Sequence, residues 1–148
     1  MKPKDPQIVA CPHCSTTSTQ RVAELLALKA TCPKCSGSLA DAGLKMRRAY
    51  DDWSTYVIAM ELTFALEKVL DCRLDDEGLE QVKTPRDVIS FVGPTREVTA
   101  AKAMAEAVQL VRRDGMFSHV YTGPDPDAVL NLDDRLVEVF RPNRWDRR

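Results

Sequence analysis

The chain has 148 residues, 44% of them hydrophobic and 29% charged, with a formal net charge of −1. This is an ordinary soluble composition with room for one medium domain or two small ones. No segment has the run of apolar residues needed to cross a bilayer, which excludes a membrane-spanning protein. Residues 1–6 contain lysines without a following apolar run, so we expect no signal peptide and a cytoplasmic location.

The near-zero net charge conceals a segregation along the chain. Residues 1–50 carry eight basic and three acidic side chains, residues 51–94 carry four and ten, and residues 95–148 carry nine and nine. Four thiolates on one Zn²⁺ would add two negative charges and leave the first segment positive. Opposite charges on neighbouring segments favour docking of the two segments on each other, with separate external partners as the alternative.

Four cysteines near the N-terminus form two Cys-x-x-Cys pairs, Cys11 with Cys14 and Cys32 with Cys35. Two such turns brought side by side supply the four thiolates of a tetrahedral zinc site, a closed shell that stabilises a fold and rarely does chemistry. Redox-active dithiols or disulfides are the alternative, which a reducing cytoplasm disfavours. We do not expect His13 to coordinate, because adjacent positions of such a turn point in different directions.

The residues around these pairs have the order of a zinc ribbon. A predicted strand precedes the first pair, Pro12 and Pro33 suit the two turns, and residues 36–39 offer a further turn and a return strand. The pattern resembles the short N-terminal zinc ribbons attached to some bacterial thioredoxins and to many unrelated bacterial proteins. The resemblance covers residues 8–39 and identifies a module, not an activity. We therefore expect a zinc ribbon over residues 1–42, followed by a linker over residues 43–50.

An amphipathic helix is predicted over residues 56–70, with Asp51, Asp52 and Ser54 as candidate N-caps. Its apolar residues form a stripe with a flank that widens it. The stripe consists of Val57, Met60, Phe64 and Val69, and the flank of Ile58, Leu62, Ala65 and Leu66.

A second, short helix is predicted after an acidic loop. Thr84 caps this helix, Pro85 occupies its first position, and Gly93 and Pro94 end it. Cys72 lies between the two helices, and we expect it to be a half-buried apolar residue rather than a reactive thiol.

The order of these parts resembles the second half of an acyl carrier protein. The recognition helix, acidic loop and following helix of that family correspond here to residues 60–67 (MELTFALE), 74–77 (LDDE) and 82–92 (VKTPRDVISFV). The resemblance implies a small helical bundle with a negatively charged recognition surface for a basic protein partner. The charges that would be offered to this partner are Glu61, Glu67, Asp75, Asp76 and Glu77.

The chain departs from the carrier pattern at the attachment site. A working carrier needs a serine in an Asp-Ser-Leu step before the recognition helix, because that hydroxyl carries phosphopantetheine. Thr55, Tyr56 and Val57 stand there instead. Ser54 lies two residues upstream, where capping is the more ordinary role and modification the alternative. The long first helix of a carrier is also missing, because residues 40–50 are too few and too basic.

The strongest predicted helix covers residues 95–113, and Gly115 stands just past its end. Its apolar positions at helical spacing are Val98, Ala101, Ala105, Val108 and Val111. One arrangement places this helix where the first carrier helix would lie, which gives a permuted bundle. Residues 116–121 and 136–140 alternate in polarity and predict a short hairpin, and the basic tail at residues 141–148 is expected to be a solvated end.

The sequence therefore predicts an α+β protein with an N-terminal four-cysteine zinc ribbon, acyl-carrier-like helices over residues 51–94, a long helix over residues 95–115, and short strands and a tail over residues 116–148. With two histidines and no nucleophile or phosphate-binding motif, catalysis is not expected. We expect a non-enzymatic zinc-binding protein that acts through protein contacts. One alternative is a carrier modified on Ser54. The other is a ribbon that binds nucleic acid through Lys29, Lys34, Lys45, Arg47 and Arg48.

Overall fold

The computed structural model describes residues 4–74, 77–92, 97–116, 130–141 and 144–145. The chain divides into two compact units, Met1–Trp53 and Ser54–Arg148, and the division falls inside the long helix α2 (Ala40–Leu70). The described residues combine one two-stranded antiparallel sheet with several helices. The expected mixture of α and β structure is therefore confirmed.

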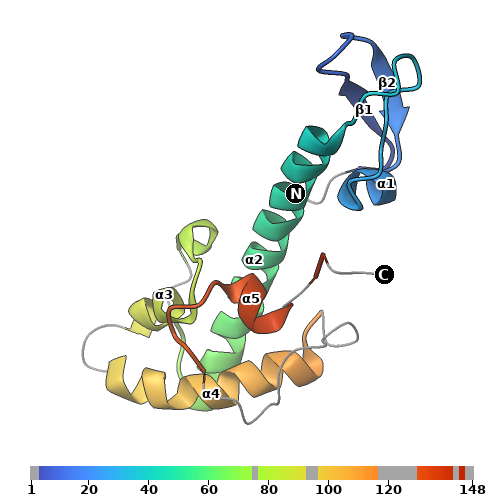
Figure 1. Ribbon diagram of the computed structural model, residues 1–148. Helices are drawn as coiled ribbons and strands as arrows, with labels where there is room; N and C mark the ends of the chain where they lie inside the picture. The colour runs from blue at the N-terminus through green and yellow to red at the C-terminus, as the bar shows by residue number, and fades with distance from the viewer. Residues whose placement is uncertain (1–3, 75–76, 93–96, 117–129, 142–143, 146–148) are drawn as a thin grey trace. The chain divides into compact units, whose positions relative to one another are not determined.

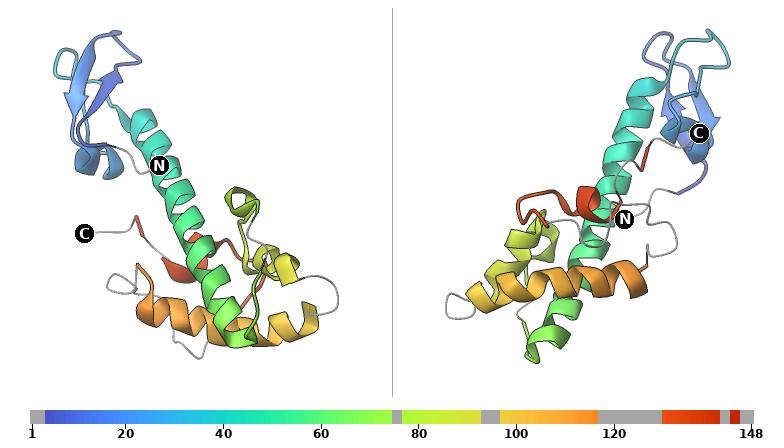
Figure 2. Two further views of the ribbon diagram at one scale, coloured as in Figure 1. Left: turned by 180° about the vertical axis from the view of Figure 1, so that it is seen from behind. Right: turned by 60° about the horizontal axis from the view of Figure 1, so that its bottom comes forward.

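The first unit begins with a β-hairpin of β1 (Gln7–Ala10) and β2 (Thr17–Gln20), in which Gln7 pairs with Gln20 and Ala10 with Thr17. The short helix α1 (Val22–Leu26) and the start of α2 complete this unit (Figure 2). The return strand expected at residues 36–39 is reduced to a single bridge between Thr31 and Ser38.

The buried cluster of the first unit is small, and the cysteines form part of it. Its members are Cys11, Leu25, Ala30, Cys32 and Leu39. Three ordinary apolar side chains bury little surface, since a fully buried Leu is worth about 1.5–3 kcal/mol. A unit with so little apolar core is of the kind that usually needs a metal or disulfides.

Helix α2 begins at Ala40, so the linker expected at residues 43–50 is helical, and the expected N-caps Asp51, Asp52 and Ser54 lie inside the helix. Gly43 lowers the helix propensity of this stretch by about 1 kcal/mol relative to Ala, which α2 tolerates. A Cβ at this position would collide with the backbone oxygen of Leu25 and the side chain of Leu28, so glycine permits close packing.

The second unit contains the rest of α2 together with η1 (Leu79–Gln81), α3 (Pro85–Ile89), η2 (Ser90–Val92), α4 (Glu97–Asp114) and α5 (Leu136–Phe140). Figures 1 and 2 show α4 crossing the last turns of α2. One large apolar cluster joins these helices. The members with no exposed surface are Ile58, Ala59, Leu62, Leu66, Val88, Ala100, Met104, Ala107, Leu136 and Val137.

The predicted cap of α3 is confirmed. The backbone N–H of Asp87 donates to the Thr84 hydroxyl at 3.2 Å, and the Asp87 carboxylate accepts from the Thr84 N–H at 3.1 Å. Pro85 occupies the first position of the helix. The expected stop at Gly93 and Pro94 lies outside the described residues.

Helix α4 confirms the long helix expected near residues 95–113. It ends where the Gly115 N–H donates to the Val111 oxygen at 2.8 Å. The buried face is only partly the expected one: Met104 is buried and Ala105 exposed, whereas Val108 and Val111 are buried as expected. An alanine-rich helix leaves this rotation ambiguous, because alanine suits either face.

Two further expectations are corrected in this unit. Leu136–Phe140 is the helix α5 rather than a strand, and four of its five residues are buried. Five residues with one polar member fit helix and strand periods equally well. The partner strand expected at residues 116–121 begins with Met116, which lies in a turn, and its other residues lie outside the described part of the chain.

The buried face of α2 also differs from the predicted stripe. Val57 is buried as expected, but Phe64 is 47% exposed and Met60 is only half-buried. The residues expected to flank the stripe form the core face instead, namely Ile58, Leu62, Ala65 and Leu66. Apolar residues surround so much of this helix that its periodicity does not single out one face.

Candidate metal centre

The two cysteine turns have the same backbone hydrogen bonds. In the first turn the Cys11 N–H donates to the Thr16 oxygen, and the Ser15 N–H donates to the Cys11 oxygen, both at 2.9 Å. In the second turn Cys32 N–H donates to Gly37 and Ser36 N–H donates to Cys32, again at 2.9 Å. The chain therefore presents two copies of one loop, each of which carries two sulfur atoms.

A serine closes each loop. Ser15 and Ser36 have φ values of 63° and 60°, in the left-handed region where glycine is the usual residue. This conformation turns the chain back just after the second cysteine of each pair. The sequence carries a signal for it that the interpretation above missed, because both turns read Cys-Pro-x-Cys-Ser.

The four sulfur atoms converge. All four lie within 4.8 Å of one another, and the separation is 3.6 Å both between Cys11 and Cys35 and between Cys14 and Cys32. Four sulfurs at about 2.3 Å from a zinc ion would form a tetrahedron with edges of about 3.8 Å. The four predicted ligands therefore fit a metal ion of this size, and their separations are those of free thiols rather than disulfides.

Backbone N–H groups point at two of the sulfurs. His13 N–H donates to the Cys11 sulfur and Gly37 N–H to the Cys35 sulfur, each at 3.4 Å. Hydrogen bonds of this kind favour the thiolate, which is the form that binds a metal. Each loop thus supplies a donor to the sulfur shell.

The thiol pKa values diverge when the sulfurs are considered without a cation. Hydrogen bonds from the side chain and backbone of Thr16 are the main cause that lowers the pKa of Cys14 to about 6; desolvation opposes them, and hydrogen bonds with Cys32 and Cys35 make smaller lowering contributions. The Gly37 N–H acts to lower the pKa of Cys35, but desolvation and the three neighbouring thiols raise it to about 11. One thiolate at this site thus suppresses ionisation of another, and a divalent cation removes that conflict.

His13 is not part of the sulfur cluster. Its side chain is exposed, and its ring approaches Gly37 so closely that a Cβ there would collide with the His13 Cδ2 atom. Within the described residues, the close group of metal-binding atoms consists of the four cysteines. Cys72 lies outside this group and is half-buried after α2, with its N–H donating to the Glu67 oxygen at 3.1 Å.

The acidic residues expected to face a partner differ in their exposure and hydrogen bonding. Glu61 and Glu67 are half-buried and each accepts a backbone N–H, from Met116 at 2.9 Å and from Leu74 at 3.1 Å. Glu77 is exposed. Asp75 and Asp76 lie outside the described residues. Glu67 therefore helps to hold the loop after α2, a role that its position in the sequence did not suggest.

Ser54 is fully buried, and its hydroxyl accepts a hydrogen bond from the Arg141 side chain at 3.0 Å. A hydroxyl in this position is not accessible for attachment of a phosphopantetheine arm.

The cations of the nucleic-acid alternative lie in the first unit, where the Arg47 side chain donates to the Leu26 oxygen at 2.9 Å. The other cations of the nucleic-acid alternative are exposed, namely Lys29, Lys34, Lys45 and Arg48.

Comparison with protein families, curated proteins and solved structures finds no match to this chain. The resemblances to a zinc ribbon and to an acyl carrier protein therefore stay predictions. None of the described helices is both long enough and apolar enough to span a membrane.

Proposed function

We propose that this chain is a non-enzymatic zinc-binding protein, in which a structural Zn²⁺ organises the first unit and the second unit binds a protein partner with a basic surface. The convergence of four cysteine sulfurs within 4.8 Å carries the metal part of this proposal. A shell of four thiolates leaves no open position for a substrate or an activated water, so the metal serves the fold.

The composition of the first unit supports a structural role for the metal. Two of the four ligands, Cys11 and Cys32, are themselves members of its small buried cluster. Burying ionised thiolates without a cation is costly, whereas zinc binding converts the same groups into cross-links between the two loops. The metal would therefore tie β1 and β2 to the loop that precedes α2.

The surface of α2 in the second unit supports the partner-binding part. Tyr56 and Phe64 are 45% and 47% exposed, and they lie two turns apart on the same side of the helix. Exposed aromatic residues are enriched where proteins meet, and acidic groups nearby favour a basic partner. Glu61 on the same helix and Glu77 after it provide such charges.

The zinc part is tested by intact mass measurement of protein purified without chelator, under native and denaturing conditions. We expect one zinc per chain in the native spectrum and an unmodified chain in the denatured spectrum, even after co-expression with a phosphopantetheinyl transferase. Native protein without zinc and with oxidised cysteines would contradict the proposal. A mass increase equal to phosphopantetheine would instead support the carrier alternative.

The partner part is tested by comparing proteins captured on the zinc-loaded chain and on two double variants. Glu61→Gln with Glu77→Gln removes two charges from the proposed surface, and glutamine at position 61 can still accept the Met116 N–H. Glu24→Gln with Glu106→Gln makes the same charge change at two exposed positions elsewhere. We expect the first pair alone to release basic partners, and equal capture by both pairs would refute the surface.

A further inference from the structure

We propose that Cys35 is a peroxide-sensitive site, and that its oxidation forms a disulfide with Cys11 across the two loops and releases the bound zinc. This inference rests on the proposed function, because it requires that the four cysteines hold a zinc ion. The first unit then loses its metal under oxidising conditions, which gives the site a regulatory role beside its structural one.

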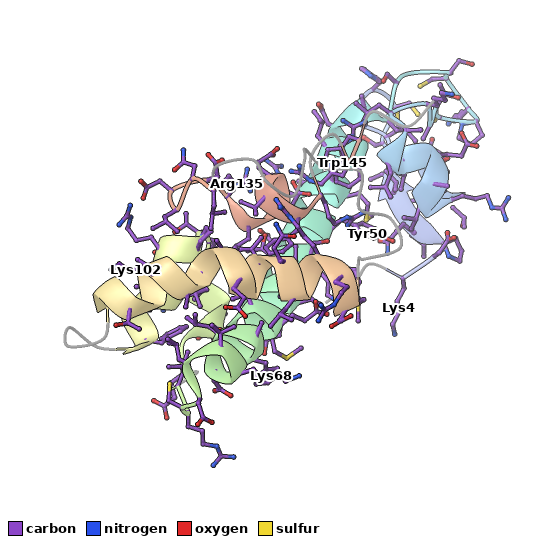
Figure 3. All side chains as sticks on the ribbon, turned by 90° about the horizontal axis from the view of Figure 1, so that it is seen from below. Lys4, Tyr50, Lys68, Lys102, Arg135 and Trp145 are labelled. Carbon is purple, nitrogen blue, oxygen red and sulfur yellow. The ribbon has the colours of Figure 1, made fainter. Side chains whose placement is uncertain are left out.

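The two cysteine loops share their backbone hydrogen bonds but do not protect their outer cysteines equally. The first cysteine of each pair is buried, with 3% of Cys11 and 1% of Cys32 exposed. The second cysteine is half-buried in the first loop, Cys14, and exposed in the second loop, Cys35. The described side chains that carry sulfur can be followed in Figure 3 by their yellow atoms. Cys35 is therefore the ligand that a dissolved oxidant reaches most easily.

The residue two positions after each outer cysteine differs between the loops. In the first loop it is Thr16, whose side chain and backbone both hydrogen-bond to Cys14. In the second loop it is Gly37, which has no side chain and donates its backbone N–H to the Cys35 sulfur at 3.4 Å. A Cβ at Gly37 would collide with the ring of His13, so the loop has no room for a threonine there. The sequence thus leaves Cys35 without the hydroxyl that Thr16 provides for Cys14.

This difference also affects the reactivity of the two sulfurs. A bound divalent cation deprotonates coordinated thiols, so both Cys14 and Cys35 are thiolates in the zinc-loaded chain. Hydrogen bonds that stabilise a thiolate reduce its nucleophilicity, and Cys14 has two of them from Thr16 where Cys35 has one from Gly37. Exposure and nucleophilicity therefore both favour reaction at Cys35.

Hydrogen peroxide is the oxidant of the proposed reaction, and it takes up two electrons from two sulfurs. The Cys35 thiolate attacks one peroxide oxygen, the O–O bond breaks, and the products are a sulfenic acid and a hydroxide ion. The Cys11 thiolate, whose sulfur lies 3.6 Å from that of Cys35, then attacks the Cys35 sulfur. An S–S bond forms as the S–O bond breaks and a second hydroxide ion leaves. Cys14 and Cys32 remain as thiolates, too few for a closed zinc shell.

The choice of Cys11 as the second thiol decides what happens to the two loops. A disulfide between Cys35 and Cys11 joins the same loops that the metal holds together. A disulfide between Cys35 and Cys32 would instead close within one loop and leave the other unattached. Because the cross-loop disulfide keeps the ligands near each other, reduction should restore the four thiolates and allow zinc to bind again.

The first experiment treats the zinc-loaded full chain with hydrogen peroxide and follows zinc release with a chromophoric chelator. A parallel sample contains dimedone, which labels sulfenic acids, and the remaining thiols are alkylated before digestion with trypsin. Cleavage after Lys34 separates Cys32, in residues 30–34, from Cys35, in residues 35–45. We expect dimedone on Cys35, zinc release in step with disulfide formation, and a disulfide to Cys11, which peptide fragmentation distinguishes from Cys14. Dithiothreitol with added zinc should reverse the change.

Two variants at equivalent positions of the loops then locate the reactive sulfur. Cys35→His and Cys14→His each leave three cysteines and one histidine, a ligand set that also holds structural zinc. At the same peroxide concentration, Cys35→His should release zinc about 10-fold more slowly than Cys14→His, because only the second variant keeps the exposed sulfur. If either variant fails to retain zinc, the dimedone label and the disulfide of the wild-type chain still decide the question.

The outcomes separate this inference from the proposed function. Zinc that stays bound in peroxide, dimedone first on another cysteine, a disulfide within one loop, or equal release from the two zinc-loaded variants would each overturn the inference alone. A chain that holds no zinc before peroxide is added contradicts the proposed function, and the inference fails with it.

Discussion

The two units of this chain achieve order by different means. The buried cluster of the first unit has five members, and two of them are cysteines of the four-sulfur cluster. The cluster of the second unit draws apolar residues from α2, η1, α3, α4 and α5, and none of its described members is a cysteine. If the proposed function holds, the first unit depends on a bound cation for stability, whereas the second depends on the burial of apolar surface. Each dependence can be broken separately.

The largest effect is expected from Cys32→Ser. Loss of one buried thiolate ligand should abolish zinc retention and unfold the first unit, because metal binding supplies on the order of 10 kcal/mol to small zinc-dependent folds. Amide signals of residues 7–20 should lose their dispersion in NMR spectra, while those of α4 remain. Cys72→Ser is the matched control, because Cys72 lies outside the sulfur cluster. Retention of zinc by Cys32→Ser would refute the four-ligand site.

The complementary change is Leu62→Ala in the second unit. Leu62 is fully buried in the large apolar cluster, so its truncation should lower the free energy of unfolding by about 2–5 kcal/mol. Urea denaturation followed by circular dichroism measures this loss, and a zinc-release assay should show one zinc still bound. Phe64→Ala is the control on the same helix, and it should cost much less because Phe64 is half exposed. Equal losses would contradict the assignment of the core face.

The features that the sequence predicts well are local ones. Two Cys-x-x-Cys turns specify sulfur ligands within four residues each, and the Thr84-Pro85 step specifies a helix start through its own backbone. The backbone hydrogen bonds within each cysteine turn are local as well, and the serine that follows both Cys-x-x-Cys pairs could have predicted them. Such features depend on residues that are close together in the sequence, so a single sequence is enough to locate them.

The features that were predicted wrongly depend on tertiary contacts. Gly43 lowers the helix propensity of this stretch, yet it lies inside α2, where a Cβ would collide with the backbone oxygen of Leu25. The rotation of α2 and the helical state of α5 are decided by which neighbours cover them, because their apolar residues permit more than one solution. The role of Glu61 depends on Met116, which is 55 residues away in the sequence.

A smaller effect within the second unit is expected from Thr84→Ala. The variant removes the hydroxyl that accepts the Asp87 N–H, and losses of such caps cost about 1 kcal/mol. The free energy of unfolding from urea denaturation should fall by this amount, with zinc retention unchanged. Thr99→Ala, at an exposed position inside α4, is the control and should be neutral or slightly stabilising. A loss as large as that of Leu62→Ala would mean that the cap has a wider role.

The smallest effect concerns a pH-dependent ion pair of the second unit. Arg86 and Asp133 lie 2.6 Å apart with both side chains more than half exposed, and the hydrogen bond from Arg86 lowers the pKa of Asp133 below its ordinary value. A carboxyl group with a depressed pKa in the folded state contributes stability above its unfolded pKa of about 3.9, and this contribution is lost as pH falls through the folded pKa. Solvent screening keeps the contribution small.

Asp133→Asn should therefore reduce stability near neutral pH and match the wild type at about pH 2, where Asp133 is protonated in both states. Urea denaturation followed by amide signals of α4 isolates the second unit, because protons also compete with zinc for the thiolates of the first. Added salt should shrink the difference at neutral pH. A difference that persists unchanged at about pH 2 would instead show that the effect of the substitution does not come from the charge of Asp133.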